Sequence, residues 1–167
     1  MRLFSLMAVV LGFVFQASAQ HHGKSHVHGA GKMSIAFEGL AGKVTLESPS
    51  ESIFGFEHVA KKESDKKKQT AALEKLEKSI SEMVVFDPKL ECIFKKESIQ
   101  VNTEGKHSDV DASFAVACKV DPVGSTITFN IQKVFGKLTD VDVQILFGDI
   151  QKSVEATKNG IAVELKK

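Results

Sequence analysis

Two strand-like stretches joined by a short polar segment place the strongest constraint on how this chain can fold. Residues 90–101 and 107–120 each have the pattern of a β-strand, and the segment between them, which contains Gly105, has the composition of a turn. A hairpin centred on Gly105 pairs residues whose numbers sum to 210. Cys92 and Cys118 fit that sum, so the hairpin sets them opposite each other with Cβ atoms about 4.5 to 5.5 Å apart.

The second strand of this hairpin shows which face is buried. Its alternate residues are apolar and share one side of the strand: Val110, Ala112, Phe114, Val116 and Cys118. In the first strand, the polar residues Lys96 and Ser98 would fall on the same core face. We therefore predict a β-bulge in the first strand.

The first 19 residues have the features of a secretory signal peptide. Arg2 precedes an apolar run over residues 3–15, and Ala17-Ser18-Ala19 fits the small-x-small cleavage pattern. The run is shorter than the roughly 20 residues that span a bilayer, and no later stretch is long enough, so we expect no membrane insertion after signal removal. In an exported chain Cys92 and Cys118 are expected to form a disulfide, whereas zinc-thiolate ligation is disfavoured by their long spacing and the lack of a CxxC motif.

Cleavage after residue 19 leaves a chain of ordinary single-domain length. We expect a His-rich arm over residues 20–31 and one α+β domain over residues 32–167. Arg2 is the only arginine, and its removal leaves equal numbers of lysines and acidic residues. A neutral chain without arginine is a poor candidate for nucleic-acid binding.

The periodicity of the domain predicts an α+β fold that is mainly antiparallel β-sheet with one long amphipathic helix. Apolar residues alternate on both sides of residues 39–42, which predicts a hairpin. Apolar residues recur at helical spacing over residues 64–84, before Asp87-Pro88. Further strands are expected over 125–130, 141–147, 150–156 and 161–165, the last two joined as a hairpin near Asn159-Gly160, with a helical turn between 131 and 138.

The arm has the composition of a metal-binding segment. It places four histidines within eight residues of a glycine-containing stretch: His21, His22, His26 and His28. Neutral imidazole is a preferred ligand of zinc, copper and nickel, and several imidazoles on flexible chain can converge on one ion. Short His-rich tracts of this kind also occur as solvated surface or as purification tags, and this is the alternative.

Two places in the domain offer further ligands. Glu57 and His58 follow Phe54 and Phe56, whose burial would hold them at the edge of the core. His107 and Asp109 are alternate residues on one side of the second strand of the cysteine hairpin, about 6.5 to 7 Å apart along the backbone. Either place could instead be an ordinary surface or turn.

These features together resemble the ZrgA family of periplasmic zinc-uptake accessory proteins. The resemblance covers essentially the whole mature chain, and its more specific parts are Gly55-Phe56-Glu57-His58 and the paired cysteines flanking His107. It implies a periplasmic protein that binds zinc and passes it to, or buffers it for, an inner-membrane ABC importer or its solute-binding protein. Carried over by position, the candidate ligands of an ordered zinc site are His28, Glu57, His58, His107 and Asp109.

This chain departs from the resemblance in one respect. Members of that family often carry a long His- and Asp-rich loop between the two cysteines, but here residues 101–109 contain a single histidine, His107, and a single aspartate, Asp109. We therefore assign the collection of metal to the arm.

Two other functions are compatible with the sequence. Cleavage after residue 19 puts His22 third in the mature chain, where its imidazole, the amino terminus and two amide nitrogens form a square-planar set suited to Cu²⁺ or Ni²⁺. A zinc hydrolase built on His58 and His107, with Glu57 as the base, is the other. The sequence has no HExxH, GxSxG or phosphate-binding loop, so a non-catalytic zinc-binding protein is the leading hypothesis.

Overall fold

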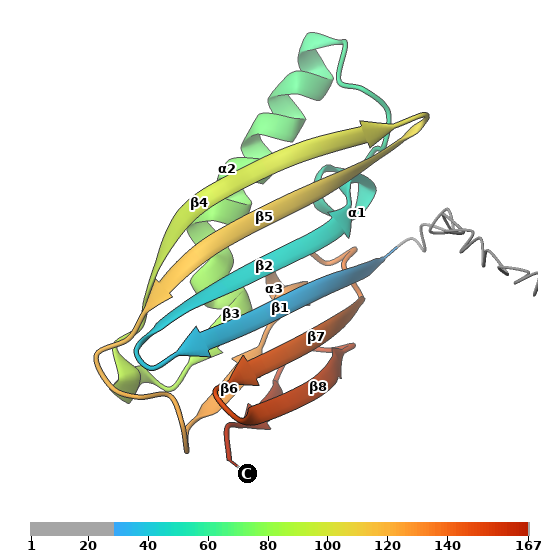
Figure 1. The fold of residues 1–167 in the computed structure, drawn as a ribbon. Helices are drawn as coiled ribbons and strands as arrows, with labels where there is room; N and C mark the ends of the chain where they lie inside the picture. Colours follow the sequence, from blue (N-terminus) through green and yellow to red (C-terminus); the bar gives the residue numbers. More distant parts are fainter. Residues whose placement is uncertain (1–28, 167) are drawn as a thin grey trace, which may run out of the picture.

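A computed structural model of the chain describes residues 29–166. The larger of its two sheets has six strands in the order β4-β5-β2-β1-β7-β8 (Figure 1). Neighbouring strands are antiparallel except for β1 and β7, which are parallel. The strands are β1 (Ala30–Glu38), β2 (Ala41–Pro49), β4 (Ile93–Glu104), β5 (His107–Ala117), β7 (Asp140–Phe147) and β8 (Ile150–Ala156). The mainly antiparallel β architecture expected from the sequence is confirmed.

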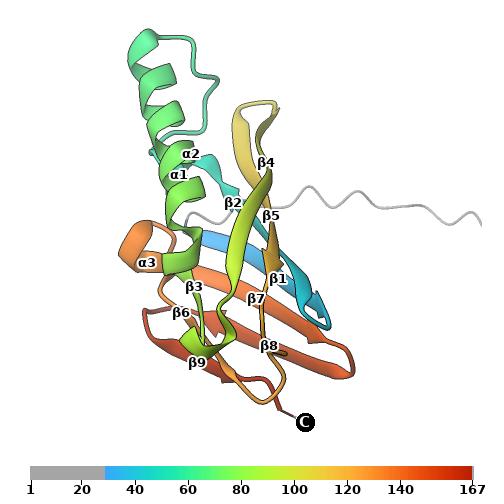
Figure 2. The same cartoon turned by 90° about the vertical axis from the view of Figure 1, so that its left-hand side faces the viewer.

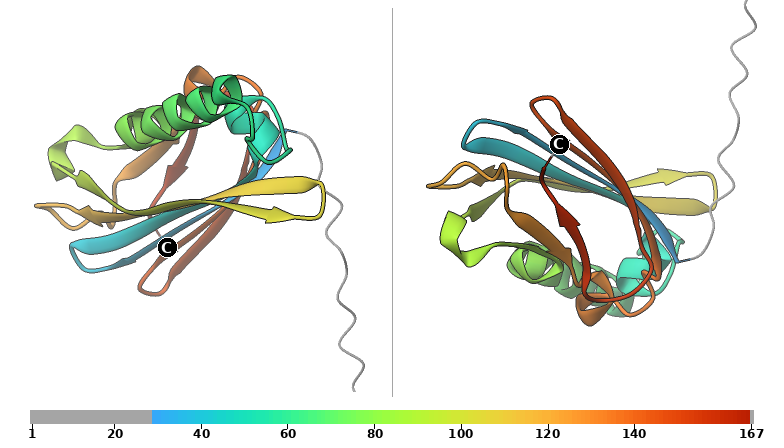
Figure 3. Two further views of the ribbon diagram at one scale, coloured as in Figure 1. Left: turned by 90° about the horizontal axis from the view of Figure 1, so that it is seen from above. Right: turned by 90° about the horizontal axis from the view of Figure 1, so that it is seen from below.

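A second layer covers one face of this sheet (Figures 2 and 3). It contains a three-stranded sheet of order β3-β6-β9 and the helices, of which α2 is the longest at 21 residues while α1 and α3 have 5 and 4. No helix within residues 29–166 is both long and apolar enough to cross a bilayer. The elements are α1 (Ser50–Phe54), α2 (Glu63–Met83), β3 (Val84–Phe86), a 3-10 helix (Pro88–Leu90), β6 (Thr126–Phe129), α3 (Ile131–Val134) and β9 (Ile161–Glu164).

The core lies between the two layers. Leu76, Ile80 and Met83 of α2 are buried, as their spacing along the helix predicts. Every second residue of β5 is also buried, and Phe114 is among the largest fully buried side chains. The opposite face of the larger sheet, which we call the outer face, carries the polar residues of the same strands.

The β4–β5 hairpin confirms the predicted bulge and corrects the predicted turn. Near the cysteines the paired numbers sum to 210, as in Phe94↔Val116, but beyond the irregularity between Lys96 and Ser98 they sum to 211, as in Glu104↔His107. The turn is therefore Gly105-Lys106 and is not centred on Gly105 alone. The bulge at Glu97 shifts the side-chain alternation, so that Ile99 and Val101 pack against the core as Phe94 does.

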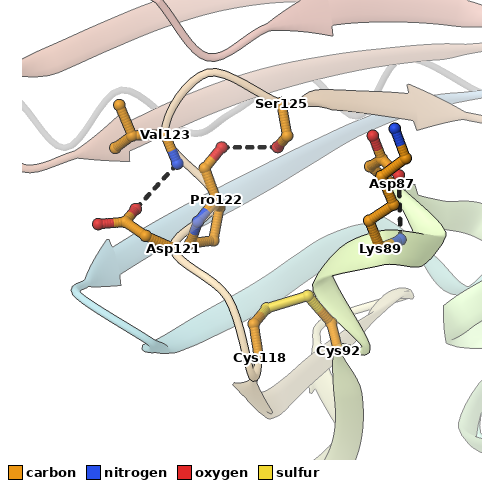
Figure 4. The surroundings of a disulfide bond; sticks show 8 residues. All are labelled: Asp87, Lys89, Cys92, Cys118, Asp121, Pro122, Val123 and Ser125. Carbon is orange, nitrogen blue, oxygen red and sulfur yellow. Dashed lines mark hydrogen bonds between the residues drawn. A yellow bond between two sulfur atoms is a disulfide. The ribbon is translucent and has the colours of Figure 1, made fainter.

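Cys92 and Cys118 form the predicted disulfide at the open end of this hairpin (Figure 4). Their Cα atoms are 3.9 Å apart. The bond joins the chain before β4 to the chain after β5, and so fixes the end of the hairpin opposite to His107.

The β1–β2 turn is shorter than the sequence indicated. It consists of Gly39 and Leu40, and Gly42 already lies in β2 opposite Phe37. A Cβ atom on Gly42 would lie 2.3 Å from the Phe37 ring. Glycine is therefore needed at 42 because the ring covers it, and not because the chain turns there.

The prediction that residues 150–156 and 161–165 form a hairpin around Asn159-Gly160 is wrong. β8 pairs with β7 in the larger sheet, whereas β9 pairs with β6 in the smaller one. Gly160 N donates to Phe129 O and to Asn130 Oδ1, and these bonds direct the chain to β6. The sequence also missed β3, because Val84 continues the apolar spacing of α2.

Candidate metal centre

The segment after α1 carries two of the predicted ligands. Gly55 ends α1 with φ 94°, a left-handed conformation, and its N–H donates to Glu51 O. The chain then reverses, and the half-buried Phe56 packs edge-on against the buried Phe54 with ring centroids 4.7 Å apart. Glu57 and His58 follow at the edge of the core, as predicted.

A buried serine ties this segment to the β5 strand. Ser108 Oγ donates to Glu57 O at 2.7 Å and lies 2.8 Å from Thr103 Oγ1. Ser108 is only 2% exposed, so its hydroxyl bonds two segments inside the protein. The backbone of Glu57 is therefore held beside the first residues of β5.

Glu57 and His107 are brought into direct contact across 50 residues of sequence. The Glu57 Oε2 atom accepts a hydrogen bond from Nδ1 of the His107 ring. The Glu57 side chain is 14% exposed and the His107 side chain 54% exposed, so the carboxylate lies behind the ring and the ring faces outward. A carboxylate on Nδ1 fixes the tautomer whose Nε2 can ligate a metal, which is the usual support of metal-binding histidines.

His58 forms a separate pair. Its Nε2 atom lies 3.2 Å from Asp65 Oδ2, and its ring stacks on Phe56 at a centroid distance of 4.6 Å. The hydrogen bond from His58 is the largest influence on Asp65 and lowers the pKa of that carboxyl below 3.8, against a smaller opposing effect of desolvation. The two imidazoles therefore each have a carboxylate partner, but not the same one.

Asp109 lies two residues beyond His107 on the outer face of β5. Its strand neighbours are Pro49 of β2 and Asn102 of β4. His107 and Asp109 therefore point to the same side of the sheet, as predicted.

The described part of the chain does not by itself complete a metal site. Within residues 29–166 no group of three or more His, Cys, Asp or Glu side chains is arranged to hold a metal ion. Glu57 and His107 are brought together, and His58 shares a surface cavity with Gly105 and Lys106, next to His107. The predicted ligands His21, His22, His26 and His28 lie outside the described residues.

Two residues that organise this region, Asp65 and Ser108, were not among the candidates predicted from the sequence. Asp65 was part of a charged run, and nothing in its spacing from His58 indicates a contact. Ser108 could have been suspected, because it is a polar residue at a core-facing position between His107 and Asp109.

A comparison with known protein families identifies the family of this chain. Residues 25–165 match the model of the ZrgA family zinc uptake protein. The chain belongs to the ZrgA family. No curated protein matches the chain. Membership relates the chain to zinc uptake, which agrees with the imidazole and carboxylate pairs on its surface, and ZrgA proteins are not known as an enzyme family.

Proposed function

We propose that this ZrgA-family chain is a non-catalytic, periplasmic zinc-binding protein that captures or buffers zinc and supports its uptake through an ABC importer. Zinc is its cargo. The arm histidines collect the ion, and an ordered site on the domain holds it with His107. This proposal rests above all on the Glu57–His107 contact, which presents one imidazole with its Nε2 directed away from the carboxylate.

The strand register supports participation of the arm. Lys32 of β1 pairs with Glu47 of β2, which pairs with Asp111 of β5, so Lys32 and Asp111 are two strand spacings, roughly 10 Å, apart. β1 and β5 run in the same direction, because each is antiparallel to β2. Counting back two residues in each strand gives Ala30, the first residue of β1, and Asp109.

The point where the arm joins the domain is fixed. Gly29 O accepts hydrogen bonds from the N–H groups of Thr139 and Asp140, so the residue after His28 is attached to the start of β7. The described chain therefore begins at the end of the larger sheet where Asp109 lies. One arm imidazole, His107 and a carboxylate such as Asp109 would give zinc three of its usual four ligands, with His58 or a second arm histidine as the fourth.

The test is zinc affinity, measured by competition with a chromophoric chelator at neutral pH on the mature, untagged chain. His107→Ala is expected to weaken the tightest site by at least about tenfold, since one of four ligands is lost. Replacing His21, His22, His26 and His28 by alanine is expected to lower both the amount of zinc bound and its affinity.

A matched control is Glu91→Gln. Glu91 is exposed and pairs with Lys119 at 2.6 Å near the disulfide, at the other end of the hairpin, so its loss should leave zinc binding unchanged. Unchanged zinc affinity in both histidine variants would overturn the proposal. Copper binding that far exceeds zinc binding, and that disappears with His22→Ala alone, would instead favour an N-terminal copper or nickel site.

A further inference from the structure

A cavity of about 540 Å³ lies between the α1–α2 connection and the β4–β5 turn. The start of α2 and the tip of the β4–β5 hairpin extend past the rest of the larger sheet on the same side (Figure 2). Three lysines dominate the lining, and we call the cavity the lysine cleft: it is lined by His58, Val59, Lys61, Lys62, Asp65, Gly105 and Lys106.

The lysines of this cleft have no close ion-pair partner within the described chain. Lys61, Lys62 and Lys106 are exposed, and none forms an ion pair with another of residues 29–166. Elsewhere on the surface, lysines do pair, as Lys96 with Glu77 at 2.5 Å and Lys119 with Glu91 at 2.6 Å. Gathering three unpaired ammonium groups around one cavity costs repulsion, which an anionic partner would relieve.

The acidic groups near the cleft offset only part of this charge. Asp65, the one carboxylate of the lining, accepts a hydrogen bond from His58 and interacts electrostatically with Lys62, so it offsets at most one of the three positive charges. Glu63 is paired with Lys66 at 2.7 Å. The 21-residue helix α2 also begins here without a side-chain cap at Lys62, so the positive end of its dipole adds to the field.

The cleft also has an apolar wall. Val59 is 52% exposed and lines the cavity together with the lysines. A concave surface with three cations and one apolar side chain fits an extended acidic peptide better than it fits a flat membrane, which cannot enter the cavity.

We propose that the lysine cleft docks an acidic peptide segment of a partner protein, with several Asp or Glu side chains around an apolar residue. Lys106 is the chain neighbour of His107, so a partner bound here would lie next to the candidate metal centre. The inference that docking would assist the transfer of zinc rests on the proposed function. Docking itself is independent of zinc and is measured without it, so the two proposals can fail separately.

The experiment measures binding of a fluorescein-labelled peptide of alternating Glu and Leu to the metal-free mature chain by fluorescence anisotropy. Binding is expected to weaken with added salt. The triple variant Lys61→Glu, Lys62→Glu, Lys106→Glu is expected to bind at least about tenfold more weakly. The control variant Lys89→Glu, Lys95→Glu, Lys158→Glu makes the same change in net charge at three exposed lysines outside the cleft, and should bind within about twofold of the parent.

Circular dichroism of both variants confirms that they fold. The proposal is overturned if the peptide does not bind, if both triple variants lose binding equally, or if a peptide with Gln in place of Glu binds as well. Tighter cleft-dependent binding to vesicles rich in phosphatidylserine would show that a membrane is the partner, and displacement by millimolar inorganic phosphate would show a simple anion site. Either result also overturns the docking of a peptide.

Discussion

The carboxylate of Glu57, just after α1, holds the Nδ1 atom of His107 at the start of β5. The pair is formed by residues 50 apart in sequence, and the hydrogen bond from Ser108 Oγ to Glu57 O holds the backbone of Glu57 beside the start of β5. The candidate metal centre therefore has an imidazole whose orientation is set before any metal arrives.

Replacing Glu57 by glutamine tests this orientation. Glutamine keeps the size of the side chain but removes the charge that stabilises the Nδ1–H tautomer of His107. Zinc affinity is expected to fall by about 10- to 100-fold, the usual effect of losing a carboxylate behind a ligating histidine. The measurement is chelator competition together with the NMR signals of the His107 ring, and an unchanged tautomer would contradict the role given to Glu57.

Removal of the disulfide should destabilise the fold without moving the candidate metal centre. Cys92 and Cys118 are separated by 26 residues, and in the chain-entropy model their cross-link stabilises the fold by about 2 to 4 kcal/mol. The double variant Cys92→Ser, Cys118→Ser is expected to lose that amount in urea unfolding. The parent treated with a reductant should match the variant, and the variant itself should not respond to the reductant.

Glu97, the bulge residue of β4, should titrate below its ordinary range. The hydrogen bond from Lys43, at 2.8 Å, is the largest influence and lowers the pKa of Glu97 below 4.5, and Ser113 Oγ lowers it further. Because the folded-state pKa is depressed, the contribution to stability is present above pH 4.5 and is lost as the pH falls through the folded-state pKa. Carbon-detected NMR titration should show this pKa rising toward 4.5 in Lys43→Met, and the same low value in that variant would contradict the assignment.

Gly42 should not tolerate even alanine. A Cβ atom at 42 would meet the Phe37 ring at 2.3 Å, and that ring cannot move freely because it stacks on Phe147 with centroids 4.5 Å apart. Gly42→Ala is expected to destabilise the fold by about 1 to 3 kcal/mol, the range for overpacked cores. Gly136→Ala is the matched control: a Cβ there meets its nearest atom at an ordinary 3.9 Å, and an equal loss of stability in both variants would count against this explanation.

Local patterns in the sequence were enough to predict much of the architecture. Alternation predicted β1, β2, β5 and β7 because each has one buried and one exposed face, and helical spacing predicted α2. The paired cysteines and the misplaced polar residues of β4 predicted the disulfide and the bulge. Lys96 fitted the core face badly by its chemistry, yet it lies on the α2 side, where its ammonium reaches Glu77 of that helix.

Contacts between distant segments required the tertiary structure. The sequence joined β8 and β9 as a hairpin because Asn159-Gly160 resembles a turn, but hydrogen bonds from Gly160 to residues 129 and 130 send β9 to the other sheet. Likewise, the sequence named Glu57, His58 and His107 as candidate ligands, but could not say which carboxylate would meet which imidazole. That was decided by the reversal at Gly55 and by Ser108, because a side-chain contact over 50 residues depends on where packing places two backbones and not on either local pattern.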